Sequence, residues 1–394
     1  MFASRTNWPL TPNRLSQLVE AFRREGRAFI DLTESNPTRC GFEFDGAEVL
    51  RALADPRSLT YQPDPRGLLA AREAVVRYYA DRGVDLNPDQ VFLTTSTSEA
   101  YSYIFRLLAN PGDAILVPRP SYPLFDFLAR LNDLELIPYP LAYHDGWAID
   151  LEGLASRLRP AAPKARAILV VHPNNPTGTF VTDEELQAML KLCRTYEMAL
   201  VADEVFSDYA FAQDSTRVIT HAAVSGALTF TLNGLSKISA LPQMKLAWIV
   251  VNGPPDALRE AEARLEIIAD TYLSVSAPLA HALPTLLESR RRLQPQILER
   301  IRANLRRLDG QLSPGCPVDR LRAEGGWYAV LRVPSTRADD DWAVELLSHD
   351  AVFVHPGHFY DFASEGYLVI SLLPQPEVFQ EGISRLLARI ANRA

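Results

Sequence analysis

Short apolar runs recur through the middle of the chain, each bounded by polar or turn-forming residues. The clearest runs cover residues 113–118, 166–171, 198–203, 227–232 and 245–251. Each is almost continuous in apolar side chains, which is typical of strands buried on both faces. Helical patterns at 122–131 and 183–196 lie between some of these runs. Strands that alternate with helices predict an α/β fold with a mainly parallel sheet covered by helices.

The pattern changes near residue 280. A long helical stretch with prolines is followed by three strand-like runs and a closing helix, at 277–312, 325–333, 351–357, 367–373 and 376–394. Near the start of the chain, residues 14–26 have the pattern of an amphipathic helix. We therefore expect three parts: an N-terminal arm that joins the small domain (1–45), a large domain (46–280) and a smaller α+β C-terminal domain (281–394).

The composition is ordinary for a globular enzyme and narrows the choice of partners. The 394 residues carry a net charge of −8 and no basic run, which argues against a nucleic-acid partner. The three scattered cysteines, Cys40, Cys193 and Cys316, suit a reducing compartment better than a disulfide framework or a zinc cluster. Because neither a secretory signal nor a membrane-spanning run is visible, we expect a cytoplasmic protein without a membrane partner.

Polar side chains follow the predicted strands, at the sheet edge where open parallel sheets bind ligands. In "TTSTSEAYSYIFRLL" (94–108) a hydroxyl-rich turn leads directly into a helix. Helix N-termini bind phosphate well, and Thr97 and Ser98 would add hydroxyl groups. Ser96 and Glu99 also match a capping box, which needs no ligand. The turn therefore predicts either a phosphate site or a simple helix cap.

Three further strand ends carry Asn175, Asp203 and Lys237. Asn175, in "HPNNPTG", either aims its amide at a ligand oxygen or belongs to a rigid turn. Asp203 ends a buried run, where a carboxylate is costly unless it has a partner such as a protonated ring nitrogen, a helix N-terminus or a cation. Lys237 becomes a nucleophile if it lies against a dry strand end, and remains inert if it lies in a surface loop.

In their order and spacing, the motifs "PNNPTG", "ADEV" and "GLSK" resemble those of fold-type I pyridoxal-phosphate enzymes, specifically the class I/II aminotransferase family. The resemblance extends from about residue 30 to the end of the chain and makes the large domain the cofactor-binding one. It implies that Lys237 forms the Schiff base, that Asp203 keeps the pyridine nitrogen protonated and that Asn175 bonds the phenolic oxygen. It also implies that Tyr122 stacks on the cofactor ring and that Tyr61 reaches the phosphate of a neighbouring subunit. The residues that it implies for phosphate binding within the same subunit are Thr97, Ser98, Ser236 and Lys245.

The function that the resemblance implies is transamination between an amino acid or amine and a 2-oxo acid, carried out by a homodimer. A lyase or decarboxylase that uses the same cofactor is the alternative, since the reaction type depends on which substrate bond stands perpendicular to the ring. A transaminase needs a 2-oxo acid acceptor for turnover and a lyase does not, so acceptor dependence separates the two.

The chain departs from the family pattern at three positions. Phe206 stands where a tyrosine usually bonds the phenolic oxygen, which predicts a raised pKa for the lysine imine. Lys245 stands where an arginine is usual, and it lacks the planar guanidinium that binds two oxygen atoms at once. Val369 replaces the arginine that holds the substrate carboxylate.

A valine cannot bind a carboxylate, so either another cation does or the substrate has no carboxylate at that place. Arg39 is the first candidate because "SNPTRCGF" resembles the segment that covers the substrate. Arg119 and Arg322 are weaker candidates. The identity of the substrate is therefore left open by the sequence.

Overall fold

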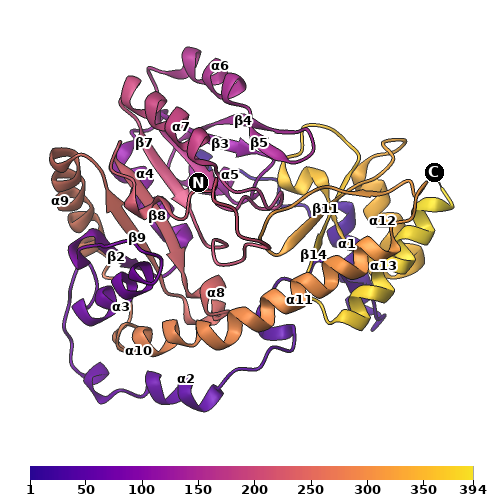
Figure 1. Ribbon diagram of the computed structural model, residues 1–394, viewed down its shortest axis with the longest axis horizontal. Helices are drawn as coiled ribbons and strands as arrows, with labels where there is room; N and C mark the ends of the chain where they lie inside the picture. Colours follow the sequence, from indigo (N-terminus) through magenta and orange to yellow (C-terminus); the bar gives the residue numbers. More distant parts are fainter. Residues whose placement is uncertain (394) are drawn as a thin grey trace.

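A large twisted sheet dominates one side of the molecule in the computed structural model, which describes residues 1–393 (Figure 1). The sheet has eight strands. In spatial order they are β2 (Val91–Thr94), β9 (Ala247–Asn252), β8 (Thr229–Gly234), β7 (Ala199–Asp203), β6 (Ala165–Val171), β3 (Ala114–Arg119), β4 (Glu135–Tyr143) and β5 (Trp147–Ile149). Strands β8, β7, β6, β3 and β4 are parallel neighbours, whereas β9 and β5 run in the opposite direction. The predicted mainly parallel sheet is confirmed.

The five apolar runs all form strands, shifted by at most two residues from their predicted bounds. In β7 and β8 every residue is buried, as expected for strands covered on both faces. The sequence pattern missed β2, β4 and β5. β2 has only four residues, and the two prolines of β4 argue against a strand because proline cannot donate to the hydrogen-bond ladder.

Helices cover both faces of the large sheet. One face packs against α4 (Thr97–Leu108), α5 (Phe125–Leu131) and α9 (Pro255–Tyr272). The other face packs against α6 (Leu151–Ala161) and α7 (Asp183–Thr195). A third apolar cluster joins β2 and β9 to α3 (Leu69–Ala80) and α10 (Ala277–Glu288), and α2 (Gly46–Leu53) packs on α10.

A smaller antiparallel sheet follows in the order β10 (Asp319–Arg320), β11 (Tyr328–Arg332), β14 (Tyr367–Ser371) and β13 (His355–Pro356). It packs with α11 (Arg290–Gln311), α12 (Asp339–Asp350) and α13 (Pro376–Ala391), and α11 runs along the molecule toward α13 (Figure 1). The predicted 277–312 stretch forms α10 and α11, which are separated at Ser289 and not at a proline. Residue 394, the last of the predicted closing helix, lies outside the described residues.

The N-terminal segment packs with the small sheet. β1 (Ile30–Asp31) pairs in parallel with β12 (Val352–Phe353), and α1 (Arg14–Arg24) contributes Leu15, Val19 and Phe22 to the same core. The division at residues 45 and 280 stays a prediction. Among the described helices, none is long and apolar enough to cross a membrane.

Candidate active site

The three side chains that follow strands lie at one edge of the large sheet. Asp203 is the last residue of β7, and the register pairs it with Val171 at the end of β6 and with Leu232 near the end of β8. Asn175 follows β6, and Lys237 follows β8. Because these strands are parallel neighbours, their carboxyl ends meet, and we call this edge with Asn175, Asp203 and Lys237 the cofactor edge.

Lys237 lies in the short helix α8 (Leu235–Ile238), directly after β8. Burial lowers its pKa to about 8, and the negative charge of Asp203 partly opposes that shift. Its Nζ lies 5.2 Å from the ring centre of Trp327 and 5.7 Å from that of Phe206. The neutral, nucleophilic form of this amine is therefore more populated near neutral pH than that of an ordinary exposed lysine.

The backbone around Lys237 is held from two sides. The hydroxyl of Tyr209 donates to the carbonyl of Lys237 at 2.6 Å. At Gly234, a Cβ would lie 2.8 Å from the Cβ of Ala247 and 3.0 Å from the carbonyl oxygen of Leu246. Only glycine allows β9 to approach this closely, which fixes the turn that presents Lys237.

Asp203 is buried and accepts two hydrogen bonds. They come from the hydroxyl of Tyr101 at 2.8 Å and from the backbone N–H of Val205 at 3.1 Å. Burial raises the pKa of this carboxyl to about 6, while the hydrogen bonds and the charge of Lys237 oppose the rise. Within residues 1–393 Asp203 has no ion-pair partner, so its charge is available to a cation at this edge.

Asn175 is buried, and its Oδ1 has no hydrogen-bond partner in the described structure. The neighbouring Asn174 fixes this segment, because its Nδ2 donates to the carbonyl of Pro120 at 3.1 Å and to Oγ1 of Thr177 at 2.9 Å. Gly178 has φ +71°, and a Cβ there would lie 2.5 Å from the carbonyl oxygen of Gly325. The turn is rigid, yet the side chain of Asn175 retains an unused bonding group.

Tyr122 belongs to the loop after β3, which Asn174 ties to the turn that carries Asn175. Its ring is 42% exposed and meets Phe125 edge-on at 6.1 Å. Burial of the hydroxyl raises the pKa of Tyr122, and the charge of Asp203 adds to the rise. The structure thus brings Tyr122, Asp203 and Lys237 together.

The predicted phosphate cradle is drawn from three elements. Thr97 and Ser98 are the first two residues of α4, where backbone N–H groups lack intrahelical acceptors. Ser236 precedes Lys237 in α8. Lys245 is exposed in a left-handed conformation with φ 50° and ψ 56°, and lies beside α8 because the N–H of Leu235 donates to the carbonyl of Leu246.

The capping box predicted at α4 is only half formed. Oγ of Ser96 accepts from the N–H of Glu99 at 3.2 Å, as predicted. The carboxylate of Glu99 accepts instead from the backbone N–H of Thr95 at 2.7 Å and from the hydroxyl of Ser274. Glu99 is drawn away from Ser96 because Ser274, distant in sequence, offers a second donor.

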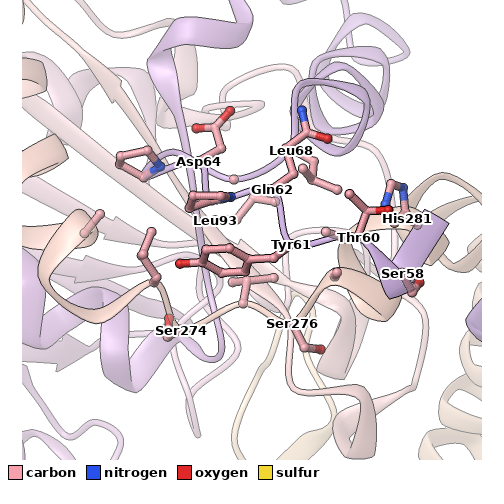
Figure 2. A pocket seen from close by; sticks show the side chains of 18 of the residues that line it. Ser58, Thr60, Tyr61, Gln62, Asp64, Leu68, Leu93, Ser274, Ser276 and His281 are labelled. Carbon is pink, nitrogen blue, oxygen red and sulfur yellow. The ribbon is translucent and has the colours of Figure 1, made fainter.

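Tyr61 lies in an exposed loop, away from any hydrogen-bond partner in residues 1–393. Its side chain is 81% exposed and projects into a cavity of about 380 Å³ between residues 58–68 and 273–281 (Figure 2). Ser274 and Ser276 line the cavity on the side of the Tyr61 ring opposite to Asp64, and His281 lines it next to Thr60.

The three departures from the expected pattern have distinct surroundings. Phe206 is buried against Trp327, with ring centres 5.3 Å apart, and faces Lys237. Val369 is fully buried in β14 between Val330 and His355. Arg39 is exposed in the turn Pro37–Arg39 and makes no side-chain hydrogen bond or ion pair within the described residues.

Reasoning from the sequence missed Tyr101 and Tyr209. Tyr101 lies one helical turn after Thr97, and that spacing was a usable signal because it places the two side chains on one face of α4. Tyr209 gave no such signal, since its partner Lys237 lies 28 positions away in the sequence.

Pyridoxal phosphate, the cofactor that the resemblance implies, fits the cofactor edge. Asn175 has an unused hydrogen-bonding group for a ring substituent, and Asp203 has a carboxylate without a cation. Lys237 has a lowered pKa and is near the charge of Asp203. These are the donors and acceptors that a cationic ring with an aldehyde group requires.

Comparisons with known proteins agree with this chemistry. Residues 29–386 match the model of the family described as aminotransferase class I and II. The glutamate-pyruvate aminotransferase AlaA of Haemophilus influenzae is 26% identical, over 93% of this chain and 92% of its own length. The alanine aminotransferase of Mycobacterium tuberculosis is 27% identical, over 92% of this chain and 85% of its own.

The fold also resembles solved structures. The alanine aminotransferase of Pyrococcus furiosus superposes with a TM-score of 0.86 at 23% identity, over the whole of both chains. An aminotransferase of Escherichia coli gives the same TM-score and identity, over 99% of this chain and 98% of its own. The family match spans most of the sequence and the fold match all of it. The chain therefore belongs to the aminotransferase class I and II family and is a pyridoxal-phosphate-dependent transaminase.

Proposed function

We propose that Lys237, Asp203 and Asn175 form the reaction centre, in which an amino group passes from an amino acid or amine to a 2-oxo acid. One observation carries this proposal: a lysine with a lowered pKa and a carboxyl with a raised pKa lie together at the ends of adjacent parallel strands. Environments that push the pKa values of two groups toward neutrality are typical of catalytic sites.

Each side chain has a separate task. When bound, pyridoxal phosphate supplies an electron sink for the carbon that loses a proton. The carboxylate of Asp203 holds a proton on the ring nitrogen, and the amide of Asn175 bonds the ring oxygen. Nζ of Lys237 takes the proton from the donor carbon and returns it, since a neutral amine with a pKa near 8 is a competent base at neutral pH.

The phosphate is assigned to Thr97, Ser98, Ser236 and Lys245. The free N–H groups at the start of α4 and its dipole favour a dianion. Lys245 adds a point charge, but not the planar fork of an arginine. Tyr122, whose side chain is partly exposed beside Asp203, would hold the cofactor ring by an aromatic contact.

We assign Tyr61 to the phosphate of a second copy of the chain, and hence propose a homodimer. Large apolar side chains are exposed around this loop and on the nearby helices: Leu50, Leu59, Leu69, Ile267 and Leu273. Such a patch marks a protein interface in globular proteins. The expected result is a dimeric mass by light scattering, with weaker cofactor binding in Tyr61→Ala.

The carboxylate of the 2-oxo acid is assigned to Arg39, whose guanidinium has no partner in residues 1–393. The names of the relatives make pyruvate the first acceptor to test, with glutamate and alanine as donors. The cytoplasmic location stays a prediction. All three cysteines are free thiols in the structure, which agrees with a reducing compartment.

The test of the reaction centre is reductive trapping. Borohydride treatment of the cofactor-loaded protein, followed by peptide mass spectrometry, is expected to find the cofactor mass on Lys237 alone. Transfer is then followed with pyruvate as acceptor. Trapping on another lysine would contradict the assigned centre, and turnover without an acceptor would contradict transamination.

A further inference from the structure

Aromatic rings surround the amine of Lys237. Trp327 and Phe206 lie 5.2 and 5.7 Å from its Nζ, and the ring of Phe206 meets that of Tyr328 edge-on at 6.2 Å. Tyr360 continues the row, 6.2 Å from Tyr328. The faces of aromatic rings attract cations, so this wall favours a positively charged group over a negative one.

Val369 shares one face of the small sheet with Tyr328. The register pairs Tyr328 with Ser371, and pairs Val369 with both Val330 and His355. Cross-strand partners point to the same face, so these five side chains form one surface, which we call the substrate face. Burial lowers the pKa of His355 to about 4, which leaves it neutral at physiological pH. These five side chains therefore carry no cation, and Arg332, which follows on the same face of β11, pairs with Asp319 at 2.8 Å.

A carboxylate lies beside this surface. The N–H of Ser371 donates to the carbonyl of Leu32, which brings residues 32–36 alongside Tyr328. Burial raises the pKa of Tyr328 to about 12, and a hydrogen bond with Ser35 opposes this rise. The nearby groups Tyr122 and Glu34 raise the pKa further, which places the carboxylate of Glu34 close to Tyr328. Glu34 accepts one bond, from the backbone N–H of Asn36 at 2.8 Å, and forms no ion pair in residues 1–393.

Two of the candidate arginines, Arg300 and Arg119, are committed elsewhere. Arg39 and Arg322 are exposed and make no side-chain hydrogen bond or ion pair within residues 1–393. Arg300 donates from Nη1 to the carbonyl oxygens of Cys40 and Leu373, both at 3.0 Å. Arg119 pairs with Asp361 at 3.0 Å. Neither guanidinium can leave these partners for a substrate carboxylate without the loss of buried or paired contacts.

We propose that the preferred amino donor is a diamine, a primary amine with a second positive charge. Glu34 and the aromatic rings described above bind the ammonium group that does not react. This rests on the proposed transamination. In the balanced reaction, the donor carbon loses its amino group and one hydrogen and gains an oxygen from water, which makes it a carbonyl. The 2-oxo acid gains the amino group and a hydrogen, releases its carbonyl oxygen as water and becomes an amino acid. In this proposal Arg39 binds the carboxylate of the acceptor, and Glu34 binds the second ammonium group of the donor.

The first experiment compares donors in the half-reaction of the cofactor-loaded enzyme. Cadaverine, pentylamine, L-alanine and L-glutamate are added without an acceptor, and the loss of the cofactor's visible absorbance is followed. Cadaverine is expected to react at least about tenfold more efficiently than pentylamine, which matches its length without the second charge. Both amines are expected to react faster than either amino acid.

The second experiment tests Glu34 directly. Glu34→Gln is expected to reduce the efficiency with cadaverine about tenfold and to leave pentylamine unchanged. Glu20→Gln, an exposed carboxylate of α1, is the matched control and is expected to behave like wild type. Calorimetry with pentyltrimethylammonium, which cannot react, measures cation binding apart from chemistry, and its affinity should fall in Glu34→Gln.

Two results would overturn the inference while leaving transamination intact: faster reaction with L-alanine or L-glutamate than with cadaverine, or unchanged cadaverine kinetics in Glu34→Gln. No reaction with any donor, when the cofactor is trapped on Lys237, would overturn the proposed function as well. Val369→Arg is expected to reverse the preference toward amino acids, with Val369→Leu as the packing control for this buried position.

Discussion

The cofactor edge and the substrate face differ in how far they keep the expected residues. At the cofactor edge, Asn175, Asp203 and Lys237 lie at the ends of adjacent strands, with Asn175 and Asp203 buried and Lys237 partly buried. At the substrate face, the buried Val369 stands where the resemblance implies a carboxylate-binding arginine, and its cross-strand partner His355 is neutral. The comparison teaches that the residues assigned to the cofactor follow strands of the large sheet, whereas Val369 lies in the small sheet, so a substitution at one place can leave the other unchanged.

The largest effect is expected at Lys237. Lys237→Ala should lower transamination by at least about 10⁴-fold, because the variant loses both the covalent anchor and the base. Lys191→Ala, on the exposed surface of α7, should retain wild-type turnover. Turnover with pyruvate and trapping by borohydride measure both losses. Near-normal turnover in Lys237→Ala would contradict the assignment of the reaction centre to the cofactor edge.

Asp203→Asn is expected to lower the rate by about 10²- to 10³-fold, since the neutral amide no longer stabilises a proton on the ring nitrogen. The measurement is the half-reaction rate with each donor. The loss should be the same for amines and amino acids, because Asp203 belongs to the cofactor edge. A loss of rate confined to one donor class would show that Asp203 also influences the choice of donor, which contradicts the separation of the two regions.

The same substitution should stabilise the cofactor-free protein. Burial raises the pKa of Asp203 from 3.8 to about 6, so the folded chain binds this proton more tightly than the unfolded chain, and stability falls as pH rises through that range. At about pH 7 the ionised carboxylate opposes folding by about 3 kcal/mol.

Urea unfolding should therefore show Asp203→Asn to be more stable than wild type by up to about 3 kcal/mol near pH 7, with little difference near pH 4. Asp85→Asn, at an exposed position, is the control and should leave stability unchanged at both values. A gain that persists at the lower pH would show that the effect does not come from the ionisation of Asp203.

Phe206→Tyr sharpens the cofactor side of the comparison. A tyrosine hydroxyl next to the ring oxygen should lower the pKa of the absorbance transition of the cofactor-loaded enzyme by about one unit. The measurement is a titration of the visible absorbance, with Phe211→Tyr as the control. An unchanged transition would mean that the missing hydroxyl does not influence the Lys237 nitrogen.

The smallest effect is expected at Arg39. Arg39→Ala should raise the KM for pyruvate about fivefold, since an exposed ion pair contributes little. The half-reaction with the donor, which involves no acceptor, should not change. A slower donor half-reaction with L-alanine would instead assign Arg39 to the donor carboxylate and weaken the contrast with Glu34.

Most of the large sheet could be predicted, because its buried strands consist of almost continuous apolar residues. β4 could not, because its two prolines resemble a loop, and it becomes a strand through pairing with β3 and β5. Asn175, Asp203 and Lys237 were accessible for the same reason, since each follows such a run. The proximity of Tyr328 and Glu34 was not predictable, because it depends on the contact between Leu32 and Ser371.

The sequence by itself determined the parallel sheet, the order of the motifs at its strand ends and the absence of an arginine at position 369. Apolar periodicity is local, so it can be read without knowledge of the fold. Only the tertiary structure decided which groups are neighbours: Tyr101 with Asp203, 102 positions apart, and Glu34 with Tyr328. Charge, burial and pKa depend on such neighbours, and the chain order does not contain them.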